Sequence, residues 1–308
     1  MGEFLVSRLL SALLVIFGVV CLVFLLIHLI PGDPVDVMLG ESARPADREA
    51  LRISLGLDRS VGVQLGRYLG GLLQLDLGTS LHARRPVSEL LAQRIPATLE
   101  LAAAALILAL LLALPLGLLA AVRRGTFWDW SAMGLSSLGI SIPNFWLGPL
   151  LVLCFSVGLG WTPVSGREAP ASLVLPAVTL GTGFAAVLAR MVRSSLLEVL
   201  GEEYVRTARA KGLGEGRVLW RHALGNAWLP ILTLIGLQLG ALLGGAVVTE
   251  VVFDWPGVGS LMIEAIQKRD YPLVQGCVLF VSLSYVLLNT LTDLAYGLVD
   301  PRIRAGDR

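Results

Sequence analysis

The amino-acid sequence predicts an all-α polytopic membrane protein with six transmembrane helices. Of its 308 residues, 55% are hydrophobic and only 15% are charged, whereas about 25% of the residues of a soluble domain are charged. The mean hydropathy is +0.77, and the apolar residues gather in runs long enough to cross the roughly 30 Å hydrocarbon core of a bilayer. The net charge of +1 provides no basic surface of the kind that binds nucleic acid, so we expect no nucleic-acid partner.

The chain begins with an anchor and a polar segment. Its first apolar run, Leu9–Ile30, is too long for the apolar core of a signal peptide. No small-residue cleavage site precedes Pro31, so we expect residues 1–30 to remain as the first transmembrane helix. Residues 31–97 are polar, with a short amphipathic stretch at Gln64–Leu75. We expect this segment to form an extracytoplasmic cap on the membrane part.

Residues 98–308 carry five further apolar runs. Thr98 opens the first of these and Arg123-Arg124 close it, while small residues and Pro143 interrupt the next. Another run repeats glycine every four residues on one helical face, which lets a second helix approach closely. The expected second to sixth spans are Thr98–Val122, Ser131–Gly158, Ser172–Val192, Trp228–Val252 and Leu273–Val299.

Six spans place both termini on one side of the membrane. The short loops on that side hold twelve Lys and Arg residues, against three on the other side. Because basic residues gather in cytoplasmic loops, this difference predicts cytoplasmic N- and C-termini. The loop at 31–97 does not enter the comparison, since loops above roughly 60 residues escape the rule.

The longest polar run between two apolar segments is the loop at 200–226. Its basic residues exceed its acidic ones by two between Glu202 and Pro230. Tyr204, Ala208 and Gly212 recur at intervals of four, which predicts one stripe of a helix. Gly212 and Gly214 should end that helix, and Val218, Leu219 and Leu224 indicate a second short one. A loop that only orients the chain by its charge needs no such helix pair, so we expect a partner to dock here.

Catalytic motifs are missing from the sequence. It contains no GxxxxGK[ST], HExxH or GxSxG pattern, and neither its cysteines nor its histidines show metal-binding or redox spacing (Cys21, Cys154, Cys277; His28, His82, His222). We therefore expect no catalytic residue, no cofactor and no metal in this chain, which we interpret as a non-enzymatic protein. Few polar residues lie within the spans (Gln238, Glu250, Asn289 and Asp293). A midplane carboxylate for ion coupling is not evident among them, although an ion-coupled carrier or a channel is the alternative of another class.

A series of short motifs runs through the chain in a fixed order. They are Pro31-Gly32-Asp33-Pro34, Leu55-Gly56-Leu57-Asp58, Leu75-Asp76-Leu77-Gly78, Pro96-Ala97-Thr98-Leu99, Ile142-Pro143-Asn144-Phe145, Leu175-Pro176, Tyr204 to Gly212, Trp255-Pro256-Gly257-Val258-Gly259, Arg269-Asp270-Tyr271-Pro272 and Asp300-Pro301-Arg302. Together they resemble the permease subunits of binding-protein-dependent ABC importers of the dipeptide, oligopeptide and nickel class. The resemblance implies a type I ABC importer permease fold, with the cap after the first helix and a coupling helix between the fourth and fifth.

In that family the central loop is the EAA loop, which sits in a groove of the cytoplasmic ATPase. Alignment on Gly212 puts Arg206, Thr207 and Ala208 at the EAA positions, and Leu224 also matches the pattern, whereas Gly225 departs from it. The resemblance implies an ATPase-coupling set of Glu203, Tyr204, Arg206, Thr207, Ala208, Arg209, Lys211 and Gly212.

The resemblance also implies the rest of a transporter in a bacterial inner membrane. The expected partners are membrane lipid, a second homologous permease, two ATPase subunits that carry ATP and Mg²⁺, and an extracytoplasmic solute-binding protein. The implied cargo is a di- or oligopeptide, with glutathione or a nickel chelate as alternatives. The expected pathway residues are Asn144, Gln238, Gly236, Gly240 and Gly244, although helix packing is the simpler interpretation of the glycines. The expected contacts to the binding protein or the outer gate are Trp255, Pro256, Gly257, Asp270 and Tyr271.

Overall fold

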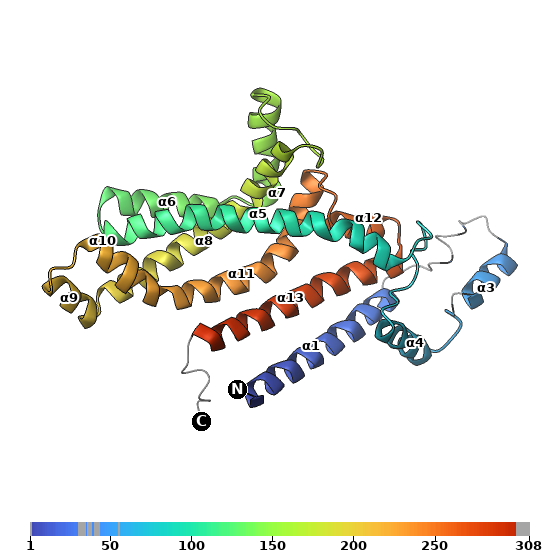
Figure 1. The fold of residues 1–308 in the computed structure, drawn as a ribbon. Helices are drawn as coiled ribbons and strands as arrows, with labels where there is room; N and C mark the ends of the chain where they lie inside the picture. Colours follow the sequence, from blue (N-terminus) through green and yellow to red (C-terminus); the bar gives the residue numbers. More distant parts are fainter. Residues whose placement is uncertain (1, 30–34, 36–38, 40–43, 55, 300–308) are drawn as a thin grey trace.

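A computed structural model describes residues 2–29, 35, 39, 44–54 and 56–299. In these residues the chain is helical and has no β-strand, apart from an isolated bridge between Thr79 and Pro86. The predicted all-α class is therefore confirmed (Figure 1). The α-helices are α1 (Gly2–Leu29), α3 (Pro45–Ser54), α4 (Val61–Leu73), α5 (Val87–Val122), α6 (Phe127–Ser141), α7 (Asn144–Leu151), α8 (Val174–Leu200), α9 (Glu203–Ala210), α10 (Glu215–Arg217), α11 (Leu224–Val252), α12 (Val258–Gln267) and α13 (Tyr271–Val299).

Four helices are long and apolar enough to cross a membrane, and a bent pair formed by α6 and α7 raises the number to five. The helix α1 has a shorter apolar stretch, Leu10–Leu25, within the described residues. The chain thus has the several apolar helices of a multi-pass membrane protein. The expected number of six depends on counting α1 as a span.

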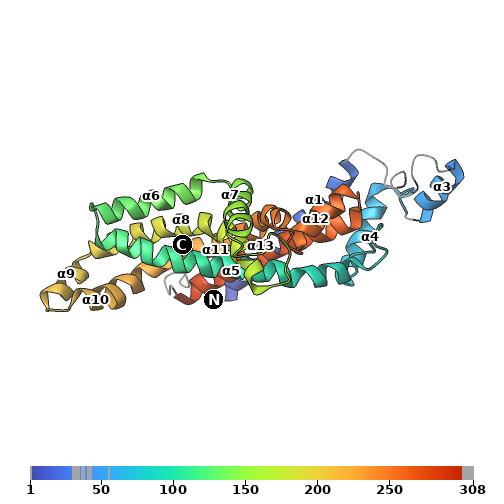
Figure 2. The same ribbon diagram turned by 90° about the horizontal axis from the view of Figure 1, so that it is seen from above.

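The long helices lie lengthwise beside one another, with α13 between α11 and α1 (Figures 1 and 2). The closest pair is α5 and α8. A methyl group at Gly181 of α8 would collide with the backbone of α5 at Ala105, and one at Gly117 of α5 would collide with Val192 of α8. The face that α5 buries here is made of alanines, so small side chains let the two backbones approach.

The third expected span is broken, as the sequence predicted. The helices α6 and α7 meet at an angle of 101°. Ile142 has extended backbone angles, φ −93° and ψ 114°, because the ring of Pro143 disfavours the helical conformation in the residue before it. After α7 the chain continues as a π-helical segment, Val152–Gly158.

Several helices extend beyond the expected spans, because they continue past the apolar runs into polar sequence. The helix α5 begins at Val87 rather than at Thr98, and α8 ends at Leu200 rather than at Val192. The loop between the fifth and sixth expected spans also contains a helix, α12. The second short helix of the central loop is not separate, since α10 continues through a π-helical turn, Val218–Ala223, directly into α11.

Some expectations fall outside the described residues. These are the motifs at 31–34 and 300–302, and the side chain of Asp293.

Candidate functional site

The candidate site is the short helix α9, which lies at one end of the molecule beyond the ends of α5 and α6 (Figures 1 and 2). Glu202 precedes it with extended backbone angles, Glu203 lies in its first turn and Arg209 in its last. This order of charges suits the helix dipole. The helix ends where expected, because Gly212 takes a φ of +81° that other residues rarely adopt.

One face of α9 packs on the bundle through a small apolar cluster. Val205 and Val218 have no exposed surface and Ala208 is 6% exposed. Partly buried Leu200 and Leu213 complete the contact. The cluster joins α9 both to the end of α8 and to the π-helical turn that leads into α11. The short helix is therefore in direct packing contact with both neighbours.

Of the predicted stripe, Ala208 is buried against the bundle, whereas Tyr204 is 41% exposed. An interval of four advances 40° around a helix of 3.6 residues per turn, and the buried direction passes through Val205 instead. Tyr204 still holds the loop together, because its hydroxyl accepts a hydrogen bond from Asn226 (2.8 Å) and donates one to the carbonyl of His222 (3.3 Å).

The opposite face of α9 is polar and exposed. Arg206 pairs with Glu203 on the same face at 3.3 Å, and the hydroxyl of Thr207 donates to the carbonyl of Glu203 at 2.9 Å. Arg209 reaches across the turn to Glu215, with nitrogen–oxygen distances of 2.7 and 3.3 Å. The predicted coupling residues thus lie on one contiguous segment. Ala208 faces inward together with Val205, which was not among the predicted residues, and the charged members face outward.

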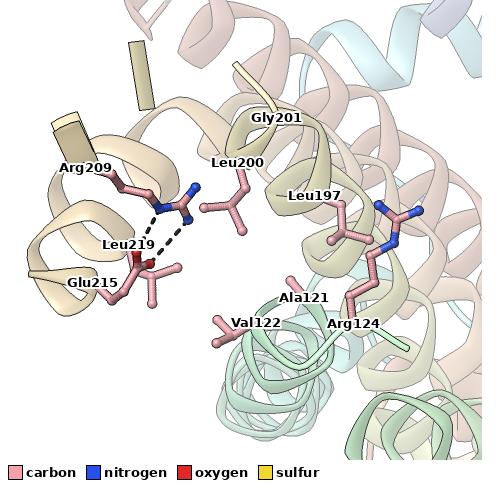
Figure 3. A pocket seen from close by; sticks show the side chains of 9 residues that line it. All are labelled: Ala121, Val122, Arg124, Leu197, Leu200, Gly201, Arg209, Glu215 and Leu219. Carbon is pink, nitrogen blue, oxygen red and sulfur yellow. Dashed lines mark hydrogen bonds and ion pairs between the residues drawn. The ribbon is translucent and has the colours of Figure 1, made fainter. Parts of the chain in front are cut away.

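A groove of about 300 Å³ separates this segment from the bundle (Figure 3). The Arg209–Glu215 pair forms one side of the groove, and Val122, Leu197 and Leu200 form the other. The segment therefore rests on the bundle through its apolar cluster rather than along its whole length.

A second polar cluster lies at the far end of α11, and sequence reasoning did not find it. Glu250 has no exposed surface. Its carboxylate accepts hydrogen bonds from the hydroxyl of Thr98 (2.7 Å) and from the amide of Ser260 (2.9 Å). The Thr98 oxygen in turn accepts from the amide of Val258 (2.8 Å). A side chain at Gly257 would overlap the Glu250 carboxylate, so the glycine leaves room for it.

Most of the residues expected to contact a binding protein are buried within this chain. Trp255 is 1% exposed and its indole donates to the carbonyl of Ala97 at 2.8 Å. Arg167 lies over the same ring at 5.8 Å. Gly257 is also buried, while Pro256 is partly exposed. Burial gives Trp255 and Gly257 a packing role, and contact with a binding protein stays a prediction.

Asp270 and Tyr271 are buried as well, at 1% and 7% exposure. The Asp270 carboxylate accepts from the hydroxyl of Ser80 and from the amides of Leu81 and His82, both at 3.1 Å. It thereby ties the segment before α5 to the start of α13.

The expected pathway residues separate into two groups. Gly236 and Gly240 pack on α13, because a methyl group there would collide with Thr292 and Tyr285 respectively, whereas Gly244 faces open space. The other group consists of two polar residues, of which Asn144 is partly buried and begins α7 directly after the break. The amide nitrogen of Gln238 is buried without a hydrogen-bond partner among the described residues.

Comparisons with known proteins agree with this arrangement. Two family models match, "Binding-protein-dependent transport system inner membrane component" over residues 113–305 and the corresponding N-terminal component over residues 1–102. The chain is 45% identical to the dipeptide transport system permease protein DppB of Escherichia coli K12, and 46% identical to the di/tripeptide transport system permease protein DppB of Pseudomonas aeruginosa UCBPP-PA14. It is 44% identical to the glutathione transport system permease protein GsiC of Salmonella paratyphi A. Each comparison covers 99% of both chains.

The fold is similar to that of solved importers. A chain of the MetNI methionine ABC transporter in an inward-facing conformation matches with a TM-score of 0.57 and 21% identity, over 69% of this chain and 97% of the other. A second crystal form of that transporter gives a TM-score of 0.59 at 23% identity, over 68% and 96% of the two chains.

Proposed function

This chain belongs to the family of binding-protein-dependent transport system inner membrane components, and we propose that it forms half of the translocation pathway of an ATP-driven importer of di- or oligopeptides. The observation that carries the proposal is the similarity to two dipeptide permeases along almost the whole chain. The cargo of these relatives is the basis for assigning peptides. Glutathione is the second candidate, because GsiC is nearly as similar, and a nickel chelate is a third member of the same class.

The proposed transporter contains a second homologous permease, two cytoplasmic ATPase subunits and an extracytoplasmic solute-binding protein. ATP and Mg²⁺ would bind on the ATPase subunits, and this chain would be a non-enzymatic subunit. In the bacterial inner membrane it would have six spans, including α1, with both termini in the cytoplasm as its basic loops favour. Residues 31–97 would form the cap on the outer side.

Coupling to ATP hydrolysis is assigned to α9. An exposed charged helix in a mostly apolar chain is a surface that only water or a protein partner can satisfy. Ala208 and Val205 hold this helix against Val218, the first residue of the π-helical turn into α11. A partner that moves α9 would therefore move α11 through packed side chains, without a flexible linker between them.

The translocation pathway is assigned to the break between α6 and α7. Non-helical backbone at membrane depth is tolerated only where it is buried in protein or lines a water-filled cavity. Ile142 and Pro143 break the helix within an apolar stretch, and Asn144 adds a polar side chain at the same point. Gln238, whose buried amide nitrogen lacks a partner among the described residues, is the second proposed pathway residue.

The test is purification of the chain from its native membrane in mild detergent, with mass spectrometry of the proteins that accompany it. Recovery of a homologous permease, a P-loop ATPase and a binding protein is the expected result. Uptake assays with labelled dipeptide, glutathione and nickel chelate then assign the cargo. A chain that purifies without an ATPase and moves solute without ATP would instead be the ion-coupled carrier or channel.

The coupling assignment has a matched pair of variants. Arg206→Glu reverses a charge on the exposed face of α9, and Arg217→Glu reverses one on the neighbouring exposed α10. We expect the first to lose the ATPase in purification and the second to retain it. Equal retention in both variants would exclude the exposed face of α9 as the docking surface.

A further inference from the structure

The turn between α5 and α6 is built around one buried carboxylate. Asp129 is 5% exposed and accepts two hydrogen bonds from Arg193 of α8, at 2.7 and 2.8 Å. It also accepts the amide of Gly125 at 3.0 Å, and Gly125 takes a φ of +74° in this turn. The turn is therefore fixed to α8, and its single acidic group is already neutralised.

The outward face of the same turn is aromatic. Phe127 is 77% exposed, Trp128 52% and Trp130 76%. These three side chains surround the first turn of α6 on the sides that Asp129 does not occupy. Farther along α6 the exposed face continues as Leu135 and Leu138, at 58% and 60% exposure. The aromatic turn is thus the end of an apolar face rather than an isolated patch.

Two exposed arginines precede these rings closely in the sequence. Arg123 and Arg124 follow the last residue of α5, and neither guanidinium has an ion-pair partner in the part of the chain that the structure describes. Figure 3 shows the guanidinium of Arg124 on the far side of Leu197 from the Arg209–Glu215 pair. Arg124 lines the same groove as Arg209 and Glu215, but Glu215 pairs with Arg209, and no ion pair joins it to Arg124 among the described residues.

The turn lies where apolar helices end. In Figures 1 and 2 it is at the same end of the molecule as α9, but α9 reaches farther out. Tryptophan is enriched at the level of lipid headgroups, where its ring meets apolar chains and its N–H meets water. Arginines at that level attract anionic lipids. Apart from the two arginines, the exposed polar residues next to the rings are Thr126 and Ser131, which carry no charge.

We propose that Arg123 and Arg124, together with Phe127, Trp128 and Trp130, form a binding surface for anionic phospholipid headgroups. The arginines contact the phosphate while the rings lie among the upper parts of the acyl chains. Because Asp129 and Arg193 hold this turn on α8, and α8 leads into α9, bound lipid would fix the level at which α9 leaves the membrane.

The test uses the purified chain, with whatever subunits accompany it, in vesicles of phosphatidylcholine or of equal parts phosphatidylcholine and phosphatidylglycerol. One lipid at a time carries brominated acyl chains, which quench nearby tryptophans. We expect brominated phosphatidylglycerol to quench more strongly than brominated phosphatidylcholine. The double variant Trp128→Phe with Trp130→Phe should lose most of this difference, although five other tryptophans remain.

The arginines are tested by the double variant Arg123→Gln with Arg124→Gln. We expect the preference for phosphatidylglycerol to fall by about fivefold for each arginine. Arg84→Gln, at an exposed arginine before the other end of α5, is the control and should change nothing. An unchanged preference in the double arginine variant would overturn the proposal. Quenching that does not depend on Trp128 and Trp130 would do the same, since it would mean that protein covers the turn. Neither result depends on recovery of an ATPase.

Discussion

The glycines of α11 offer a test in which one helix supplies its own controls. Gly236, Gly240 and Gly244 repeat every four residues, yet only the first two pack on α13. A methyl group at Gly236 would collide with Thr292, and one at Gly240 with the ring of Tyr285, whereas Gly244 has open space around it. We therefore expect Gly→Ala substitutions at these three positions to differ in stability.

The sizes follow from the neighbours. Replacing glycine by alanine inside a helix stabilises it by up to about 1 kcal/mol, and this gain is common to all three variants. Overpacking costs typically about 1–3 kcal/mol. Thr292 is tied by a hydrogen bond to the carbonyl of Leu288 at 2.7 Å, so it cannot rotate without losing that bond. Tyr285 is 45% exposed, and its ring has room to swing outward. The expected order of destabilisation is Gly236→Ala, then Gly240→Ala, with Gly244→Ala neutral or stabilised.

Thermal unfolding of the three variants in detergent measures the order directly. Melting temperatures that fall equally in all three would contradict the assignment of the first two glycines to packing on α13. If Gly244→Ala lowered the melting temperature of the assembled transporter but not that of the isolated chain, the glycine would lie against the second permease.

Three further changes address the other polar contacts. Asp129→Asn should weaken the pairing with Arg193 and lower the free energy of unfolding by about 1.5–3 kcal/mol, measured by thermal unfolding. An unchanged melting temperature would contradict a stabilising role for this ion pair. Glu250→Gln keeps the size of the side chain but turns its amide NH₂ toward one of the two hydrogen-bond donors. We expect the free energy of unfolding to fall by about 1–3 kcal/mol in the same assay. A variant as stable as the wild type would show that the carboxylate is not needed as a double acceptor. The exchange of Arg209 and Glu215 should leave stability within about 1 kcal/mol, since the pair is exposed. Peptide uptake should fall in Arg209→Glu alone and recover in the exchanged pair, and failure to recover would mean that Arg209 contacts a partner directly.

Hydropathy was sufficient to predict the fold class, and Pro143 with its small neighbours was sufficient to predict the break, because both depend on local properties of the chain. Hydropathy was insufficient for the ends of the helices. A helix does not stop where the bilayer does, and α5 continues to Val87 through residues such as Glu89 and Arg94 that favour water. Apolarity marks the part of a helix that lipid surrounds, whereas backbone hydrogen bonding decides where it ends.

The candidate site was predictable to a similar degree. An exposed charged segment between two apolar runs identified α9, and Gly212 ended it as expected. The predicted stripe of Tyr204, Ala208 and Gly212 did not include Val205, which the bundle buries completely, since a short helix offers too few apolar residues to define its buried direction. Which neighbours the helix meets depends on α8 and α11, and no local pattern contains that information.

The loop after α11 shows why a glycine-rich aromatic motif is easily interpreted as a recognition surface. Trp255 and Gly257 look like an exposed turn because tryptophan, proline and glycine are common in loops. In the structure the motif folds over Glu250, whose carboxylate needs donors because it has no contact with water. The amide of Ser260 and the hydroxyl of Thr98 supply them, and the absence of a side chain at Gly257 lets the backbone come close enough. A buried carboxyl group thus explains the glycine, and its hydrogen-bond partner Thr98 lies far away in the sequence on α5.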